Sequence, residues 1–340
     1  MRVLTDIDTA ATTARVTWWR SALGPSILFI TAMVIGSLLG TMVAGAADAL
    51  SPVVDPMILV VLTLLFIEVR VGGVRHLMRT PRIALLVLTV NFLVAPIVAF
   101  GLTSVLVADE ALRLGVLIYC LFPCTDWFLG FTRAAGGDTA TGAAIIPVSL
   151  VLQLALFPVY VSLLSGAVID STFSSIGSTM LTWFVLPAGI ALLVRLALRA
   201  LLTPERRDGV RAVAGQAVPF ALAVMIVALF AANVTALLDD ASLVGLVLLV
   251  VAAFFITMGL VGEGIARALR LPHAERSLLL VSISARNAPL MLALTALTLP
   301  GQPLIVAAIV VGMLLEFPHL TVLTAYLRRS RARRVKAEAR

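Results

Sequence analysis

Charged residues are scarce in this sequence. Asp, Glu, Lys and Arg make up 13% of its 340 residues, whereas 61% of the residues are apolar. A soluble protein carries about 25% charged residues, so the deficit excludes an ordinary soluble domain and is typical of a polytopic membrane protein. The formal net charge is +7, but the basic residues separate apolar runs instead of forming one face. We therefore do not expect nucleic acid as a partner.

The sequence also lacks the patterns of several functional classes. It contains no Gly-x-Ser-x-Gly or Gly-x-Gly-Asp pattern of an intramembrane enzyme, and no phosphate-binding glycine motif of an ATP-driven pump. The three histidines have no metal-ligand spacing. The two cysteines, Cys120 and Cys124, lie in one apolar run, where a helix would stack them on one face. We expect no enzymatic activity, cofactor, metal or disulfide.

Long apolar runs dominate what is present. Ten segments are long enough to cross a bilayer, for which about 20 residues are needed. They cover roughly residues 23–46, 54–72, 82–107, 111–133, 140–167, 176–201, 213–237, 242–268, 276–298 and 303–327.

The basic residues predict the orientation of these spans. If the N-terminus is cytoplasmic, 23 of the 25 basic residues lie in inner segments, Arg113 lies in an outer loop and Arg286 lies within the membrane. The positive-inside rule then predicts that both termini lie in the cytoplasm, and we expect the protein in the plasma membrane. Residues 1–22 would form an inner segment that does not resemble a signal peptide, and residues 328–340 would form a basic tail.

Two of the ten spans are interrupted at matching positions. Ten spans divide into two sets of five, residues 23–167 and 168–327, and an odd number per set requires any repeat to be inverted. The fourth span of each set contains a proline beside polar residues, in Phe122-Pro123-Cys124-Thr125-Asp126 and in Ser284-Ala285-Arg286-Asn287-Ala288-Pro289. Matched broken spans indicate the binding site of a secondary transporter.

Three ionisable residues lie near the middle of spans: Asp126, Arg286 and Glu316. Arg286 has two possible roles. It either forms a structural salt bridge, or it acts in function by replacing a coupling cation or by contacting an anionic ligand. Asp126 is either a helix cap or a counter-ion and proton carrier, and Glu316 either pairs with Arg286 or carries the coupled proton. If all three are ionised, their net charge is −1, and an unpaired negative charge at that depth favours proton uptake.

Other polar residues in or near the spans need separate interpretations. Cys124 is either a small buried hydrophobe or, beside the Pro123 break, a soft ligand for a thiophilic ion. We expect Cys120 to have a packing role, Glu263 to be solvated or to face a loop, and Asp138 to be a turn residue.

The two interrupted motifs resemble a known family. The stretch from Phe122 to Asp138 resembles the fourth span of arsenical-resistance permeases, the arsenite efflux proteins of the bile acid/arsenite/riboflavin transporter superfamily. Ser284-Ala285-Arg286-Asn287 resembles their ninth span, and Leu315-Glu316-Phe317-Pro318 resembles their tenth. The resemblance implies an all-α fold of ten transmembrane helices in two inverted five-helix repeats. It also implies panel and core domains, with the broken fourth and ninth helices crossing in the core.

The resemblance also implies a function. Family members export arsenite, and some also export antimonite, generally in exchange for protons. The expected substrate-binding residues are Cys124, as the arsenite thiolate ligand, with Thr125, Arg286 and Asn287; the expected proton-coupling residues are Asp126 and Glu316. A homodimer is left open. The alternative is a sodium- or proton-coupled organic anion transporter of the same fold.

The chain also departs from the family pattern. Trp127 is bulkier than expected, and Asn287 is followed by Ala288-Pro289 instead of serine. Arg286-Asn287 stands where bile-acid symporters have a glutamine-asparagine pair. A fixed cation at that place argues against sodium binding, because like charges repel.

Overall fold

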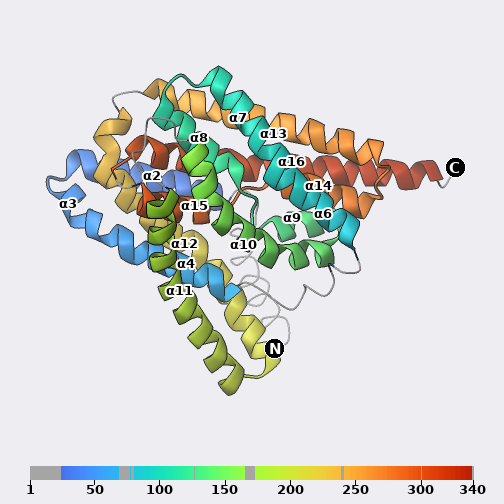
Figure 1. The fold of residues 1–340 in the computed structure, drawn as a ribbon, viewed down its shortest axis with the longest axis horizontal. Helices are drawn as coiled ribbons and strands as arrows, with labels where there is room; N and C mark the ends of the chain where they lie inside the picture. The colour runs from blue at the N-terminus through green and yellow to red at the C-terminus, as the bar shows by residue number, and fades with distance from the viewer. Residues whose placement is uncertain are drawn as a thin grey trace, which may run out of the picture.

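The computed structural model describes residues 24–68, 77, 80–125, 127–164, 173–238, 241–299 and 301–338, and in these ranges it contains helices and no β-strand (Figure 1). The helices are α2 (Gly24–Met42), α3 (Ala46–Leu50), η1 (Ser51–Val53), α4 (Val54–Glu68), α6 (Pro81–Thr89), η3 (Val90–Val94), α7 (Ala95–Leu106), α8 (Glu110–Leu121), α9 (Phe128–Ala134), α10 (Thr139–Leu164), α11 (Phe173–Leu201), α12 (Pro204–Leu238), α13 (Ala241–Ala268), α14 (His273–Ser284), α15 (Ala288–Thr298) and α16 (Pro303–Glu338).

The helices confirm a multi-pass membrane protein. Six helical stretches of the described chain are long and apolar enough to cross a bilayer: Ala46–Ile67, Pro81–Leu106, Thr139–Leu164, Pro204–Ala232, Leu243–Ala268 and Pro303–Arg333. The predicted fourth and ninth spans are not among them, because each is divided into two short helices. The count of ten spans and the inverted repeat therefore stay predictions.

Two groups of helices can be distinguished by their packing. Helix α12 packs along α2 and α4, and α4 packs against α11; α16 packs against α8 and α13, and α13 packs against α14. The groups meet where α16 contacts α2 and α12, and where α15 contacts α4 and α11. The broken helices thus lie in one group, with the other group packed against them.

Glycines allow the closest approaches between these helices. A Cβ atom at Gly36 of α2 would lie 2.6 Å from the Val227 carbonyl oxygen of α12. A Cβ atom at Gly115 of α8 would lie 2.8 Å from the Ile305 backbone of α16. Small residues at helix interfaces in membranes permit such contacts, and the second one holds α8 against the helix that carries Glu316.

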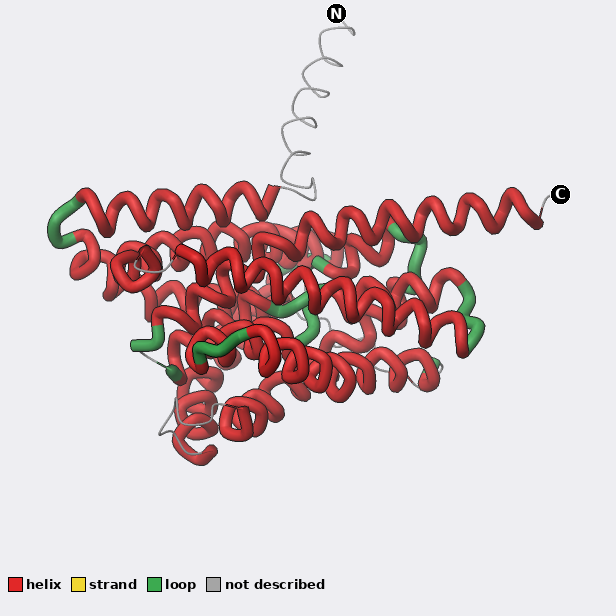
Figure 2. The backbone as a smooth tube through the Cα atoms, turned by 90° about the horizontal axis from the view of Figure 1, so that it is seen from above, coloured by secondary structure: helices red, strands yellow, loops and turns green. Residues whose placement is uncertain are grey.

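The structure describes the chain near its C-terminus but not its first residues. Residues 1–22 lie outside the described residues. The residues predicted as a basic tail, 328–340, continue α16 as helix to Glu338, and this end of α16 projects beyond the other described helices (Figure 2).

Candidate functional site

Both predicted helix interruptions are present. Helix α8 ends at Leu121 and α9 begins at Phe128, while α14 ends at Ser284 and α15 begins at Ala288. Proline explains the breaks locally. Pro123 has no N–H to continue α8 and disfavours helical backbone at the residue before it, and Phe122 is extended. Pro289 lies in the first turn of α15, where a missing N–H is tolerated.

The two breaks pair with each other through their backbones. Pro123 and Arg286 form an isolated antiparallel bridge. The Cys124 N–H donates to the Ala285 carbonyl oxygen at 2.9 Å, and the Asn287 N–H donates to the Phe122 carbonyl oxygen at 2.9 Å. Non-helical backbone at membrane depth is tolerated only where protein or water satisfies its polar groups, so each break supplies what the other needs.

The guanidinium of Arg286 lies among carbonyl oxygens at the ends of two half-helices. The residue is fully buried. Its Nη1 donates to the Cys120 carbonyl oxygen at 3.0 Å, and its Nη2 donates to the Ser282 carbonyl oxygen at 3.4 Å and to that of Ile283. These carbonyls belong to the last turns of α8 and α14, where backbone acceptors lack helical partners and the helix dipole is negative.

Two further groups lie beside this guanidinium. Asn91 Oδ1 accepts a hydrogen bond from Nη2 at 3.0 Å, and the Asn91 amide nitrogen donates to Ser282 Oγ at 3.1 Å. The Phe254 ring centroid lies 5.5 Å from the Arg286 Cζ atom, within reach of a cation–π contact. The positive charge is therefore held by oxygens and an aromatic face.

A salt bridge between Arg286 and a carboxylate is not observed among the described residues. The Arg286 side chain forms no ion pair with Glu316 there; instead, its backbone N–H donates to Glu316 Oε1 at 3.0 Å. The other predicted partner, Asp126, lies outside the described residues. Arg286 thus locks the two broken helices together through helix-end carbonyls.

Glu316 is fully buried and is held by neutral donors. Besides the Arg286 N–H, its Oε1 accepts from the Trp127 indole N–H at 2.8 Å, and its Oε2 accepts from the Tyr119 hydroxyl at 3.4 Å. Trp127, which departs from the family pattern, therefore contacts the predicted coupling residue directly. The carboxyl links α16 to both breaks.

A second polar cluster lies on the other side of the paired breaks. The Asn287 side-chain amide donates to Gln153 Oε1 at 2.7 Å and to Thr125 Oγ1 at 3.2 Å. The Gln153 amide in turn donates to the Pro123 carbonyl oxygen at 2.9 Å. Asn287 Oδ1 also accepts from the Leu290 N–H at 3.4 Å, as the N-cap of α15. The predicted Thr125 and Asn287 are thus brought together.

Cys124 lies on the bridge itself, 4% exposed, with its neighbour Thr125 at 9%. Cys120 is fully buried, and its carbonyl group, rather than its thiol, holds Arg286. Neither cysteine forms a disulfide, and the described residues contain no group of His, Cys, Asp or Glu side chains that could hold a metal ion.

Sequence reasoning missed Asn91 and Gln153. Each is an amide within a long apolar run. Because amide side chains are scarce in such runs, their presence could have marked these two residues as candidates for the site. Asn91 also lies in η3, a π-helical turn; such turns are frequent at functional sites. No pattern in the sequence connects either amide to a break in a distant span.

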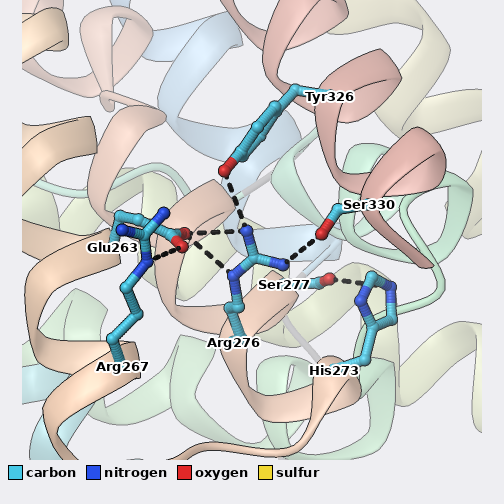
Figure 3. A network of polar contacts seen from close by, with 7 residues as sticks. All are labelled: Glu263, Arg267, His273, Arg276, Ser277, Tyr326 and Ser330. Atoms are coloured by element: carbon cyan, nitrogen blue, oxygen red, sulfur yellow. Dashed lines mark hydrogen bonds and ion pairs between the residues drawn. The ribbon is translucent and has the colours of Figure 1, made fainter. Parts of the chain in front are cut away.

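Glu263 was predicted to be solvated or to face a loop, and the structure shows it in ion pairs between helices instead. Its side chain is only 15% exposed and lies 2.8 Å from both Arg267 and Arg276. Arg276, whose side chain is 3% exposed, also donates to Tyr326 and Ser330 of α16 (Figure 3). A buried charge needs a partner, and the partners of Arg276 come from two other helices. The network therefore ties the end of α13 and the start of α14 to α16.

Asp138 has a more specific role than the predicted turn residue. Its Oδ1 accepts from the Thr141 N–H at 3.0 Å and from the Ala140 N–H at 3.1 Å, which caps the first turn of α10. Its own N–H donates to the Ala274 carbonyl oxygen at 3.0 Å, so the loop before α10 is held against the start of α14.

The network of Figure 3 allows a matched stability test. Arg276→Gln should lower the free energy of unfolding by about 3–5 kcal/mol, because it breaks a buried ion pair. Arg267→Gln removes the other contact of the same carboxylate, but the Arg267 side chain is 70% exposed, so its effect should stay below about 1 kcal/mol. Thermal unfolding in detergent compares the two variants. Equal shifts would contradict the assigned role of burial.

Comparison with known proteins identifies the family of this chain. Residues 55–263 match the model of the Sodium Bile acid symporter family. The "P3 protein" of Homo sapiens and that of Bos taurus are each 26% identical over 257 residues, covering 72% of this chain and 52% of each relative. The chain thus spans about half the length of these curated relatives. Because the family match covers more than half of the chain, this protein belongs to the sodium bile acid symporter family.

Proposed function

We propose that this protein is a secondary active transporter that exports arsenite, and also antimonite, across the plasma membrane in exchange for protons. The observation that carries the proposal is the paired break, which places Cys124 beside Arg286 on a short stretch of bridged backbone, where the Arg286 N–H donates to the Glu316 carboxyl of α16. Family membership supports the broader statement that the chain transports an ion or small molecule.

Arg286 supports a transporter that does not use sodium at the crossing. In broken-helix transporters, unwound carbonyls and half-helix C-termini coordinate the coupling cation. Here such carbonyls, from Cys120, Ser282 and Ile283, accept hydrogen bonds from the guanidinium. Since a guanidinium remains protonated at physiological pH, a second cation at this place would meet a like charge. We infer that Arg286 is a built-in substitute for a coupling sodium ion.

Glu316 supports proton coupling. Its described donors are neutral groups, so gaining or losing a proton breaks no ion pair there. Protonation would instead remove an acceptor from Trp127, Tyr119 or the Arg286 N–H, and these groups lie on the broken helices. A proton on Glu316 would thereby change the contacts of the crossing. Asp126, the other proposed proton carrier, immediately precedes Trp127.

Cys124 supports arsenite as the substrate. Arsenic(III) is thiophilic, and cysteine is a soft ligand that selects soft ions. A single thiol at the crossing provides one sulfur contact, which can be released during a transport cycle more readily than a closed site of several thiols. Thr125, Asn287 and Arg286 provide the polar neighbours that we assign to binding.

Alternating access would move the two helix groups against each other. We propose that α2, α4, α11 and α12 form the panel and that the broken helices with α13 and α16 lie in the core. The ten-span, inverted-repeat topology with cytoplasmic termini belongs to this proposal. Rocking of one bundle around a central site is the common mechanism of such transporters.

A second candidate, favoured by the family description, is transport of an organic anion. In that case the carboxylate or sulfonate of the substrate would be held by Arg286 after it leaves some of its carbonyl partners. The thiol of Cys124 would then have no special role.

Substitution of the two cysteines separates the candidates. Cys124→Ser should reduce arsenite export at least tenfold, because the hydroxyl is a poor ligand for arsenic(III). Cys120→Ser, one turn away, should retain most of the export and serves as the control. Arsenite accumulation in cells that express each variant is the measurement. Export retained by Cys124→Ser would favour the organic anion.

Proton coupling is tested at Glu316. Glu316→Gln keeps a side-chain oxygen for Trp127 and for the Arg286 N–H, but it cannot exchange a proton. Transport by reconstituted vesicles should no longer respond to an imposed proton gradient. Glu110→Gln changes a largely exposed carboxyl and should leave the response intact. A wild-type response in Glu316→Gln would exclude Glu316 as the coupling residue.

The substitute-cation role is tested by Arg286→Gln. The variant exposes the half-helix carbonyls, so transport should either be lost or become dependent on sodium. Sodium should also raise the melting temperature of the purified variant and leave that of the wild type unchanged. Unchanged transport without any sodium effect would reduce Arg286 to a structural residue.

A further inference from the structure

A groove between α4 and α11 lies away from the paired breaks. Its volume is about 320 Å³, and it is lined by Phe66 of α4 and, on α11, by Ala188, Ala191, Leu192, Arg195, Leu196 and Arg199. One wall is therefore apolar, while two arginines one helical turn apart stand at one end.

The two arginines have no acidic partner among the described side chains. Arg195 donates to the Phe66 carbonyl oxygen at 3.3 Å, and Arg199 is exposed. Arg211 of α12 adds a like charge that acts on Arg195, although Arg211 itself pairs with Asp208 at 3.2 Å. This end of the groove is therefore positive, and an anion would complement it.

The position along α11 corresponds to the edge of the bilayer. On one side of the groove, Val185, Leu186, Leu192 and Leu193 are between 54% and 67% exposed, as lipid-facing side chains are. On the other side, α11 ends at Leu201 and the charged start of α12, with Arg206 and Arg207, follows. Arginines that extend from an apolar helix to such a boundary reach the headgroup level.

We propose that this groove binds one anionic phospholipid, with its phosphate on Arg195 and Arg199 and an acyl chain along Ala188 and Leu192. Basic pockets between transmembrane helices are typical of sites for acidic lipid headgroups, and guanidinium groups form paired hydrogen bonds with phosphate. A free phosphate ion would use the arginines and leave the apolar wall without a function.

The test uses the purified full chain in a neutral detergent. Native mass spectrometry should show one retained phosphatidylglycerol. Thermal unfolding should show stabilisation by phosphatidylglycerol, with little effect of phosphatidylcholine or inorganic phosphate. Arg195→Gln with Arg199→Gln should weaken phosphatidylglycerol binding about tenfold or more, given roughly 1 kcal/mol for each basic residue near an anionic surface.

Controls separate this site from general charge attraction. Arg82→Gln with Arg206→Gln removes the same charge from exposed positions outside the groove and should leave binding unchanged. Ala188→Trp fills the groove and should weaken lipid binding with both arginines in place; it also serves if the double glutamine variant does not fold.

Three results would overturn the proposal. The first is wild-type binding by both groove variants. The second is equal stabilisation by inorganic phosphate, which would indicate a free-anion site. The third is a dimer whose contact covers Ala188 and Arg199. None of these measurements involves transport, so they are independent of the proposed function.

Discussion

The structure depends on one interaction, the placement of the Arg286 guanidinium among the carbonyl oxygens at the ends of α8 and α14. A helix that stops inside a membrane leaves its last carbonyls without partners, and no water is available in the bilayer core to replace them. A cation at this place satisfies two helix ends at once and opposes the negative ends of both dipoles. The same contacts stabilise the desolvated guanidinium. The buried charge therefore depends on the free carbonyls of the broken helices, and those carbonyls depend on the charge.

The remaining polar groups around the paired breaks follow from the same constraint. The backbone bridge between Pro123 and Arg286 satisfies part of each break. Gln153 and Asn287 occupy the next unpaired groups, on one side of the bridge. Glu316 joins the other side through a backbone N–H and the Trp127 indole. A change at Glu316 would therefore reach both broken helices.

The two buried arginines, Arg276 and Arg286, are stabilised by different kinds of partner. Arg276 lies near the ends of its helices and is neutralised by Glu263, with Tyr326 and Ser330 completing its donors. Arg286 lies at the paired breaks, where the described partners of its side chain are dipoles instead of a carboxylate. An ion pair would cancel the charge of Arg286. Dipoles leave a net positive charge, which would attract an anion and repel a cation.

The sequence by itself determined the class of the protein and the location of the breaks, because apolar length and proline act locally. It also indicated that Arg286 and Glu316 belong together, since a charge in an apolar run needs polar company. Only the tertiary structure decided which polar groups contact Arg286 and Glu316. Asn91 and Gln153 come from spans with no pattern that relates them to Arg286, and Glu263 is buried by neighbours distant in sequence. Which oxygen faces the guanidinium depends on how the ends of α8 and α14 lie relative to each other, and helix periodicity alone contains no information about that placement.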